Sequence, residues 1–147
     1  MLKVIYISIL LLVSFSISAK EEYFLTLRND KVNLRQGPSF EYPIKLFYKK
    51  KFLPVLIQDE FENFRKIRDH ENNTGWIHIS QLSKKKAAIT IEDDQLIFNK
   101  PSIYSKPLAI LKEGRLCKII KCKNEWCKVS VEEYKGWVKK NILWGLL

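Results

Sequence analysis

The stretch Val32-Asn-Leu-Arg-Gln-Gly-Pro-Ser39 has a counterpart 63 residues further along the chain, Gln95-Leu-Ile-Phe-Asn-Lys-Pro-Ser102. More paired landmarks follow in the same order, at an offset of 63, then 62, then 61. They are 48–53 with 111–116, 63–67 with 125–129, and 75–77 with 136–138. Ordered landmarks that need only two one-residue slips indicate an internal repeat. We therefore expect two copies of one unit, joined by the charged linker 83–86.

Each copy has the pattern of short strands separated by turns. In the first copy the expected strands are 24–28, 31–35, 44–48, 52–57, 64–68 and 75–79, with a long loop at 36–43 that contains two prolines. No stretch of eleven or more residues after position 19 keeps a helical period. Short, regularly spaced strands predict an all-β protein built from small barrels or sandwiches. A unit of this size has a marginal core, so packing of the two copies against each other would help.

The first nineteen residues are typical of a secretory signal peptide. Lys3 gives a basic start, residues 4–19 carry no charge, and Lys20-Glu-Glu22 ends the apolar run. The alternative is a buried N-terminal helix. The uncharged run is shorter than the roughly 20 residues of a spanning helix, so we expect no stable membrane insertion after cleavage. We therefore predict a signal peptide at 1–19, a first domain at 20–84 and a second at 85–147, in a periplasmic or secreted protein.

Composition narrows the partners of such an exported chain. The 147 residues include 26 Lys and Arg against 16 Asp and Glu, a formal charge of +10, and 46% are hydrophobic, which is too apolar for a disordered chain. Of the basic residues 21 are lysines and only 5 are arginines, the residue that reads phosphate and bases in bidentate fashion. The charge therefore favours an anionic envelope over nucleic acid.

The motifs of the first copy resemble the bacterial SH3-like domain. These motifs are, in chain order, Val32–Ser39, Tyr42-Pro43, residues 64–67 and Gly75-Trp-Ile77. Two further stretches, 60–69 and the ending 136–145, resemble one branch of these proteins, which is secreted, carries two copies and is found in proteobacteria. The resemblance implies two tandem, five-stranded, partly open SH3-like barrels in a non-catalytic envelope protein, whose relatives often bind cell wall. Phe64 replaces the usual Trp, and the second copy lacks the Arg-x-Gly-Pro-Ser motif.

Five residues of the first copy are candidates for ligand binding: Arg35, Phe40, Tyr42, Tyr48 and Trp76. The guanidinium of Arg35 could hold a carboxylate of a wall peptide; the structural alternative is an ion pair with Glu60 or Glu62. The aromatic residues 40, 42 and 48 could form an exposed groove for an extended peptide. Trp76 could stack on a sugar or proline, but core packing is the commoner role at this position.

All three cysteines lie in the second copy. Cys122 and Cys127 flank a four-residue turn, so a disulfide across this hairpin is favoured, with 117–122 and 117–127 as the other pairings. Cys117 lies in an apolar run and is expected to be a buried thiol, although an intermolecular bridge or a redox role is also open.

The sequence predicts a binding module without catalysis, cofactor or metal. Both histidines lie in the copy that has no cysteine, zinc spacing is missing, and the paired acids fall at predicted turns. The leading hypothesis is recognition of peptidoglycan or an extended peptide, mainly through the first copy. The alternatives are a structural protein that docks on another envelope protein, and a thiol enzyme or sensor based on Cys117 or Cys122.

Overall fold

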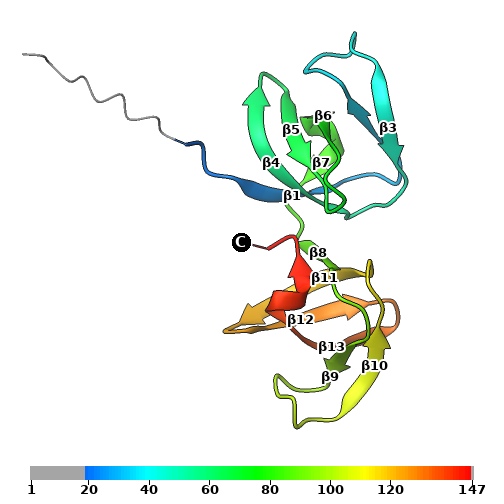
Figure 1. Ribbon diagram of the computed structural model, residues 1–147, viewed down its shortest axis with the longest axis vertical. Coiled ribbons are helices and arrows are strands. Elements are labelled where there is room, and N and C mark those ends of the chain that lie inside the picture. Colours follow the sequence, from blue (N-terminus) through cyan, green and yellow to red (C-terminus); the bar gives the residue numbers. More distant parts are fainter. Residues whose placement is uncertain (1–18, 147) are drawn as a thin grey trace, which may run out of the picture.

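The computed structural model describes residues 19–146, so the predicted signal peptide at 1–19 lies almost entirely outside it. The described chain is all-β and forms two antiparallel sheets of seven strands each, one above the other in Figure 1. The count is seven rather than the expected five, because the first strand of each copy and a two-residue strand at its end also join the sheet. The sequence was therefore right about the fold class.

The first sheet has the order β3-β2-β6-β5-β4-β1-β7, which places β3 and β7 at its edges. Its elements are β1 (Tyr23–Leu27), β2 (Val32–Arg35), β3 (Ile44–Tyr48), β4 (Pro54–Phe61), β5 (Phe64–Arg68), β6 (Thr74–His78), the 3₁₀ turn η1 (Ile79–Gln81) and β7 (Leu82–Ser83). Buried and half-buried positions alternate along β2 and β6, as expected for strands with one face on a core.

The second sheet repeats this order as β10-β9-β13-β12-β11-β8-β14. Its elements are β8 (Ala87–Thr90), β9 (Gln95–Phe98), β10 (Pro107–Leu111), β11 (Leu116–Lys123), β12 (Trp126–Val131), β13 (Tyr134–Lys139), the 3₁₀ turn η2 (Lys140–Ile142) and β14 (Leu143–Trp144). Strand pairing confirms the repeat, since Arg35 lies opposite Trp76 as Phe98 lies opposite Trp137.

The expected strand 52–57 was placed two residues too early, and the alignment of the two copies around it was off by one residue. Phe52 has a φ of 65°, which is incompatible with a strand, and β4 begins only at Pro54. The amide of Phe52 donates to the Leu27 carbonyl, as the amide of Gly114 donates to that of Thr90. Phe52 is therefore the counterpart of Gly114, 62 residues apart. The offset between the two copies changes from 63 to 62 within the turn that precedes residue 52.

Glycines allow β2 and β6, and their counterparts β9 and β13, to come close together. A methyl group at Gly75 would lie 2.7 Å from the Arg35 carbonyl oxygen, and one at Gly136 would lie 2.5 Å from that of Phe98. The close approach of two backbones thus explains the glycine of each Gly-Trp pair.

The two copies pack against each other. Ile89 of β8 is buried in the hydrophobic core of the first copy, and Leu116 packs against that core. Across the junction the rings of Phe24 and Trp144 meet edge to face at 4.9 Å, and the Thr26 hydroxyl donates to the Lys85 carbonyl at 2.7 Å. Figure 1 shows β8 and the end of the chain at the junction. The described residues contain no helix long and apolar enough to cross a membrane.

Candidate functional site

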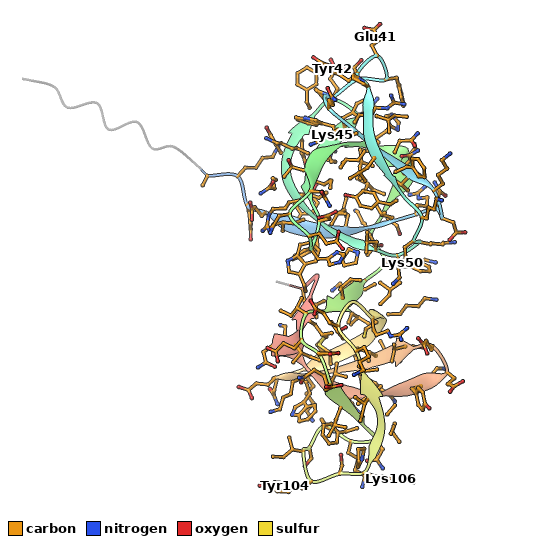
Figure 2. The ribbon with its side chains drawn as sticks, turned by 45° about the vertical axis from the view of Figure 1, so that its right-hand side comes forward. Glu41, Tyr42, Lys45, Lys50, Tyr104 and Lys106 are labelled. Atoms are coloured by element: carbon orange, nitrogen blue, oxygen red, sulfur yellow. A yellow bond between two sulfur atoms is a disulfide. The ribbon has the colours of Figure 1, made fainter. Side chains whose placement is uncertain are left out.

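The loop between β2 and β3, residues 36–43, is closed by its own backbone. The amide of Gln36 donates to the Pro43 carbonyl, that of Tyr42 to Ser39, and that of Ser39 to Gly37. The Ser39 hydroxyl also accepts from the amide of Glu41. These bonds hold the loop in one conformation without a ligand. Figure 2 places Glu41 and Tyr42 at the far end of the first copy, away from the second.

The Arg35 side chain holds this loop closed through hydrogen bonds to its backbone. Its Nη1 donates to the carbonyl oxygens of Phe40 at 3.0 Å and Tyr42 at 2.9 Å, and its guanidinium lies 5.3 Å from the centre of the Phe40 ring. The ion pair proposed with Glu60 or Glu62 does not form. Glu60 pairs with Arg65 and Lys20 instead, and the carbonyl of Glu62 accepts from Arg65. Arg35 therefore has a structural role, while the rest of its guanidinium makes no hydrogen bond to a described residue.

Phe40 packs on the rings of Phe64 and His78, and we call these three rings the aromatic platform. Its ring centre lies 5.2 Å from that of Phe64 and 5.0 Å from that of His78, and the latter two lie 5.1 Å apart. Phe64 is buried, whereas Phe40 remains 63% exposed. The amide of Ser80 donates to His78 Nδ1, which makes Nδ1 the acceptor and leaves the proton of the neutral ring on Nε2. The platform thus presents an apolar ring beside an N–H donor.

Tyr42 is the second exposed aromatic of the loop. Its ring lies directly against Gly37, where an added methyl group would come within 2.5 Å of the ring carbons. The side chain is 48% exposed. Gly37 is therefore required so that Tyr42 can lie flat over the loop. Two of the three aromatic residues expected in the groove, Phe40 and Tyr42, are exposed.

Tyr48 was wrongly placed in this exposed groove. It is only 9% exposed, and its hydroxyl donates to Asp69 Oδ2 at 2.9 Å. Burial and the neighbouring carboxylate raise the pKa of Tyr48 far above its ordinary value. Asp69 accepts further bonds from the amides of Glu71 and Asn73, so the pair closes a turn. Trp76 is half-buried on β6, opposite Arg35 and Lys66.

The second copy keeps the geometry of the loop without its motif. The amides of Asn99, Ser102 and Ser105 repeat the three backbone bonds of the first loop. The Ser105 hydroxyl lies 3.0 Å from the Lys100 carbonyl oxygen and 2.7 Å from that of Ser102, so this loop is closed through other carbonyls than those that Arg35 holds in the first copy. Ile103 and Tyr104 are exposed, and Figure 2 places Tyr104 at the opposite end of the molecule from Tyr42.

The platform of the second copy has a different chemistry. Trp126 stands in place of Phe64 and meets the Phe98 ring edge to face at 5.7 Å. Lys139 replaces His78, with its Nζ 4.7 Å from the centre of the Trp126 ring. No exposed ring corresponding to Phe40 is left, because Ile103 occupies that position.

The cysteines follow the favoured pairing. Cys122 and Cys127 lie opposite each other on β11 and β12 and form a disulfide. Cys117 is a fully buried free thiol, and burial raises its pKa from 9.0 to about 11. A thiolate nucleophile at Cys117 would need the opposite shift. The described residues contain no group of three or more potential metal ligands.

Comparison with known proteins identifies the repeated unit. The model of the bacterial SH3 domain matches residues 28–84 and again 92–145. The chain belongs to the bacterial SH3 domain family. Domains of this family are generally binding modules.

More distant likenesses concern solved structures. NlpC2 from Trichomonas vaginalis is 13% identical over 86% of this chain and 49% of its own, with a TM-score of 0.39. NlpC1 from the same organism is 16% identical over 94% of this chain and 50% of its own, with a TM-score of 0.38. The chain spans about half the length of each. A search of curated proteins found no match.

Proposed function

We propose that this tandem bacterial SH3 protein is a non-catalytic envelope-binding module whose first copy recognises peptidoglycan or an extended peptide. The observation that carries the proposal is the pair of exposed rings, Phe40 and Tyr42, on a loop that Arg35 and backbone bonds already hold closed. A preorganised loop avoids the entropic cost of ordering on binding.

Each group of the loop has a distinct part in this proposal. Phe40 and Tyr42 offer flat apolar faces for a sugar or a proline ring. Nη1 of Arg35 already donates to the loop carbonyls. A carboxylate of a wall peptide would therefore accept hydrogen bonds from Nε and Nη2 of the same guanidinium. The N–H of His78 adds a donor beside the Phe40 ring. The lysine surplus attracts the protein to an anionic wall over longer distances.

Cosedimentation with purified peptidoglycan tests the proposal. Phe40→Ala together with Tyr42→Ala should weaken the affinity for peptidoglycan about thirtyfold, since the two ring contacts that a ligand would bury contribute on the order of 1 kcal/mol each. The matched control is Ile103→Ala with Tyr104→Ala, which removes exposed side chains from the equivalent loop of the second copy. Failure of the unaltered protein to pellet, even at low salt, would exclude the wall as ligand.

We also propose that the chain is exported to the periplasm or beyond and that cleavage follows Ala19. The support is the uncharged run 4–19 with its basic start, together with a disulfide, which persists in oxidising compartments. Mass spectrometry of the protein isolated from cell fractions should find Lys20 as the first residue. A cytoplasmic protein that still begins at Met1 would contradict export.

A second candidate function is docking on another envelope protein by strand addition. β3 is an edge strand that pairs only with β2, and its Phe47 is 48% exposed. A lysine whose ammonium group is free blocks such pairing on an edge, whereas that of Lys45 on β3 is bonded to the Thr74 carbonyl. Phe47→Lys should abolish capture of an envelope partner and leave wall binding intact, whereas Ile110→Lys on the equivalent edge strand β10 should change neither. Unchanged capture of the partner by Phe47→Lys would exclude strand addition at β3.

A further inference from the structure

A cluster of unpaired lysines surrounds one ring at the junction of the two copies. The Nζ atoms of Lys51, Lys85 and Lys118 lie 5.3, 5.6 and 4.7 Å from the centre of the Phe52 ring. The three lysines come from the first copy, the linker and β11 of the second copy. We call this group the waist cluster. It exists only in the assembled two-copy molecule, unlike either loop.

The charge of the waist cluster is not compensated within the described chain. None of its three ammonium groups forms an ion pair with a described residue. Because all three surround one ring centre, any two of them are within about 11 Å of each other, close to the Debye length of roughly 10 Å at 0.1 M salt. Three like charges at this spacing repel one another, and an anion would relieve that repulsion.

The backbone at Phe52 is independently unusual. Its φ of 65° is in the left-handed region, which is unfavourable for a residue with a side chain, and the second copy has Gly114 at the same position with a φ of 78°. The first copy thus keeps a bulky aromatic where its own twin uses the unstrained residue. The consequence visible in the structure is that the ring stands between lysines of three segments. Strain of this kind is found at functional sites.

The surface beside the waist cluster is hollowed and basic. A depression of about 320 Å³ is lined by Lys50, Lys118 and Arg115, with Glu132 as its one acid. Glu132 is already paired with Arg115 at 2.8 Å. Figure 2 places Lys50 at the constriction between the copies. A flexible chain can enter a constriction, whereas a flat bilayer surface is held off by the two copies on either side.

We infer that the waist cluster and the adjoining depression bind a flexible polyanion, a polymer with closely spaced phosphate or carboxylate groups. Lysine ammonium groups bind such anions as point charges, without the geometric selection of an arginine fork. The ring of Phe52 holds the three ammonium groups near one another, because the face of an aromatic ring attracts cations. This site is separate from the loop proposed to bind wall.

Charge-matched variants test the waist cluster. Lys51→Gln, Lys85→Gln and Lys118→Gln together should weaken binding of labelled inorganic polyphosphate about tenfold or more at low salt. The control triple Lys66→Gln, Lys100→Gln and Lys106→Gln removes the same charge from exposed lysines elsewhere and should weaken it less than about threefold. Equal losses in both triples, or no binding of either polyphosphate or polyglutamate by the unaltered protein, would overturn the inference.

Three further arms define the site. Polyglutamate measured in parallel distinguishes carboxylate from phosphate ligands; binding of either one through the waist cluster supports the inference. Polyphosphate should protect lysines 51, 85 and 118 of the unaltered protein from amine acetylation more than it protects lysines 66, 100 and 106. This measurement does not depend on the folding of any variant. Phe40→Ala with Tyr42→Ala should leave polyphosphate binding unchanged, so failure of the wall proposal and failure of this one can be told apart.

Discussion

Residues with positive φ shape the turns of both copies, and glycine fills only some of these positions. Gly114 has a φ of 78° and open space around its α-carbon, whereas Gly75 lies in a strand where a methyl group would meet the Arg35 carbonyl oxygen at 2.7 Å. The first glycine is needed for conformation and the second for close approach. The two requirements have different energetic costs.

Gly114→Ala and Gly75→Ala should separate these costs. Gly114→Ala should lower the free energy of unfolding by about 1 kcal/mol through backbone strain alone. Gly75→Ala should lower it by roughly 2–3 kcal/mol, because neither backbone at the contact can move aside easily. Urea unfolding provides the comparison. A larger loss at Gly114 than at Gly75 would contradict this assignment of roles.

Cys117 should behave as an inert thiol in the folded protein. Its raised pKa of about 11 against 9.0 leaves roughly a hundredfold less thiolate near pH 8 than an ordinary cysteine has, apart from the steric protection of burial. Iodoacetamide should therefore modify Cys117 only after unfolding, as mass spectrometry would show. Rapid modification of the native protein would revive the thiol-enzyme hypothesis.

The same shift predicts the effect of alkaline pH on stability. The folded pKa lies above the unfolded value, so the contribution of the protonated thiol is fully present below pH 9 and is lost as pH rises toward about 11. The stability difference between the unaltered protein and Cys117→Ala should shrink over this interval. A difference that grows with pH would contradict the buried neutral thiol.

Several residue roles could not be predicted from the sequence because they depend on a partner distant in the chain. The burial of Tyr48 is decided by Asp69, and the partners of Arg35 are loop carbonyls that carry no sequence signal. Phe52 in a left-handed conformation contradicts its β-forming character. By contrast, exposed Phe40 and Tyr42 were predictable, since they lie in a loop bounded by proline and glycine.

At the scale of elements, the hairpin of β11 and β12 is the one that carries a disulfide. Local spacing was sufficient to favour Cys122 with Cys127, because directly opposite strand positions lie close enough for the bond. The loop it closes is short, so its stabilising effect is modest. The hairpin also lies in the second copy, away from the proposed ligand loop.

Reduction of this disulfide should cost about 2 kcal/mol of unfolding free energy without affecting wall binding. Urea unfolding with and without a reductant measures the first effect, and cosedimentation under reducing conditions measures the second. Cys117→Ser, which keeps the disulfide, controls for the free thiol. Loss of wall binding on reduction would mean that the second copy contributes to the ligand site.

At the scale of the whole molecule, the repeat was evident from the sequence but the packing between the copies was not. The linker 83–86 looked like a solvated charge run, whereas Thr26 bonds to Lys85 and Ile89 completes the core of the first copy. Periodicity identifies which residues face a core, but it does not say which copy supplies that core. The waist cluster follows directly from this arrangement.

Shared packing predicts that the two copies unfold together. Calorimetry of the unaltered protein should show one unfolding transition. Trp144→Ala removes the ring that packs on Phe24, so it should lower the free energy of unfolding by roughly 3 kcal/mol and broaden or split the transition. Phe61→Ala, at an exposed position of the first copy, is the control and should leave a single transition. Two separate transitions in the unaltered protein would show that the copies fold independently.

The proposed function places ligand recognition in the loop 36–43 of the first copy. The most direct measurement is a titration of isotope-labelled protein with soluble peptidoglycan fragments, followed by amide chemical shifts. We predict the largest shifts at Gly37–Ile44 and at His78, with little change at the equivalent loop 99–106. Shifts centred on the second loop, or no shifts at saturating fragment, would contradict the claim.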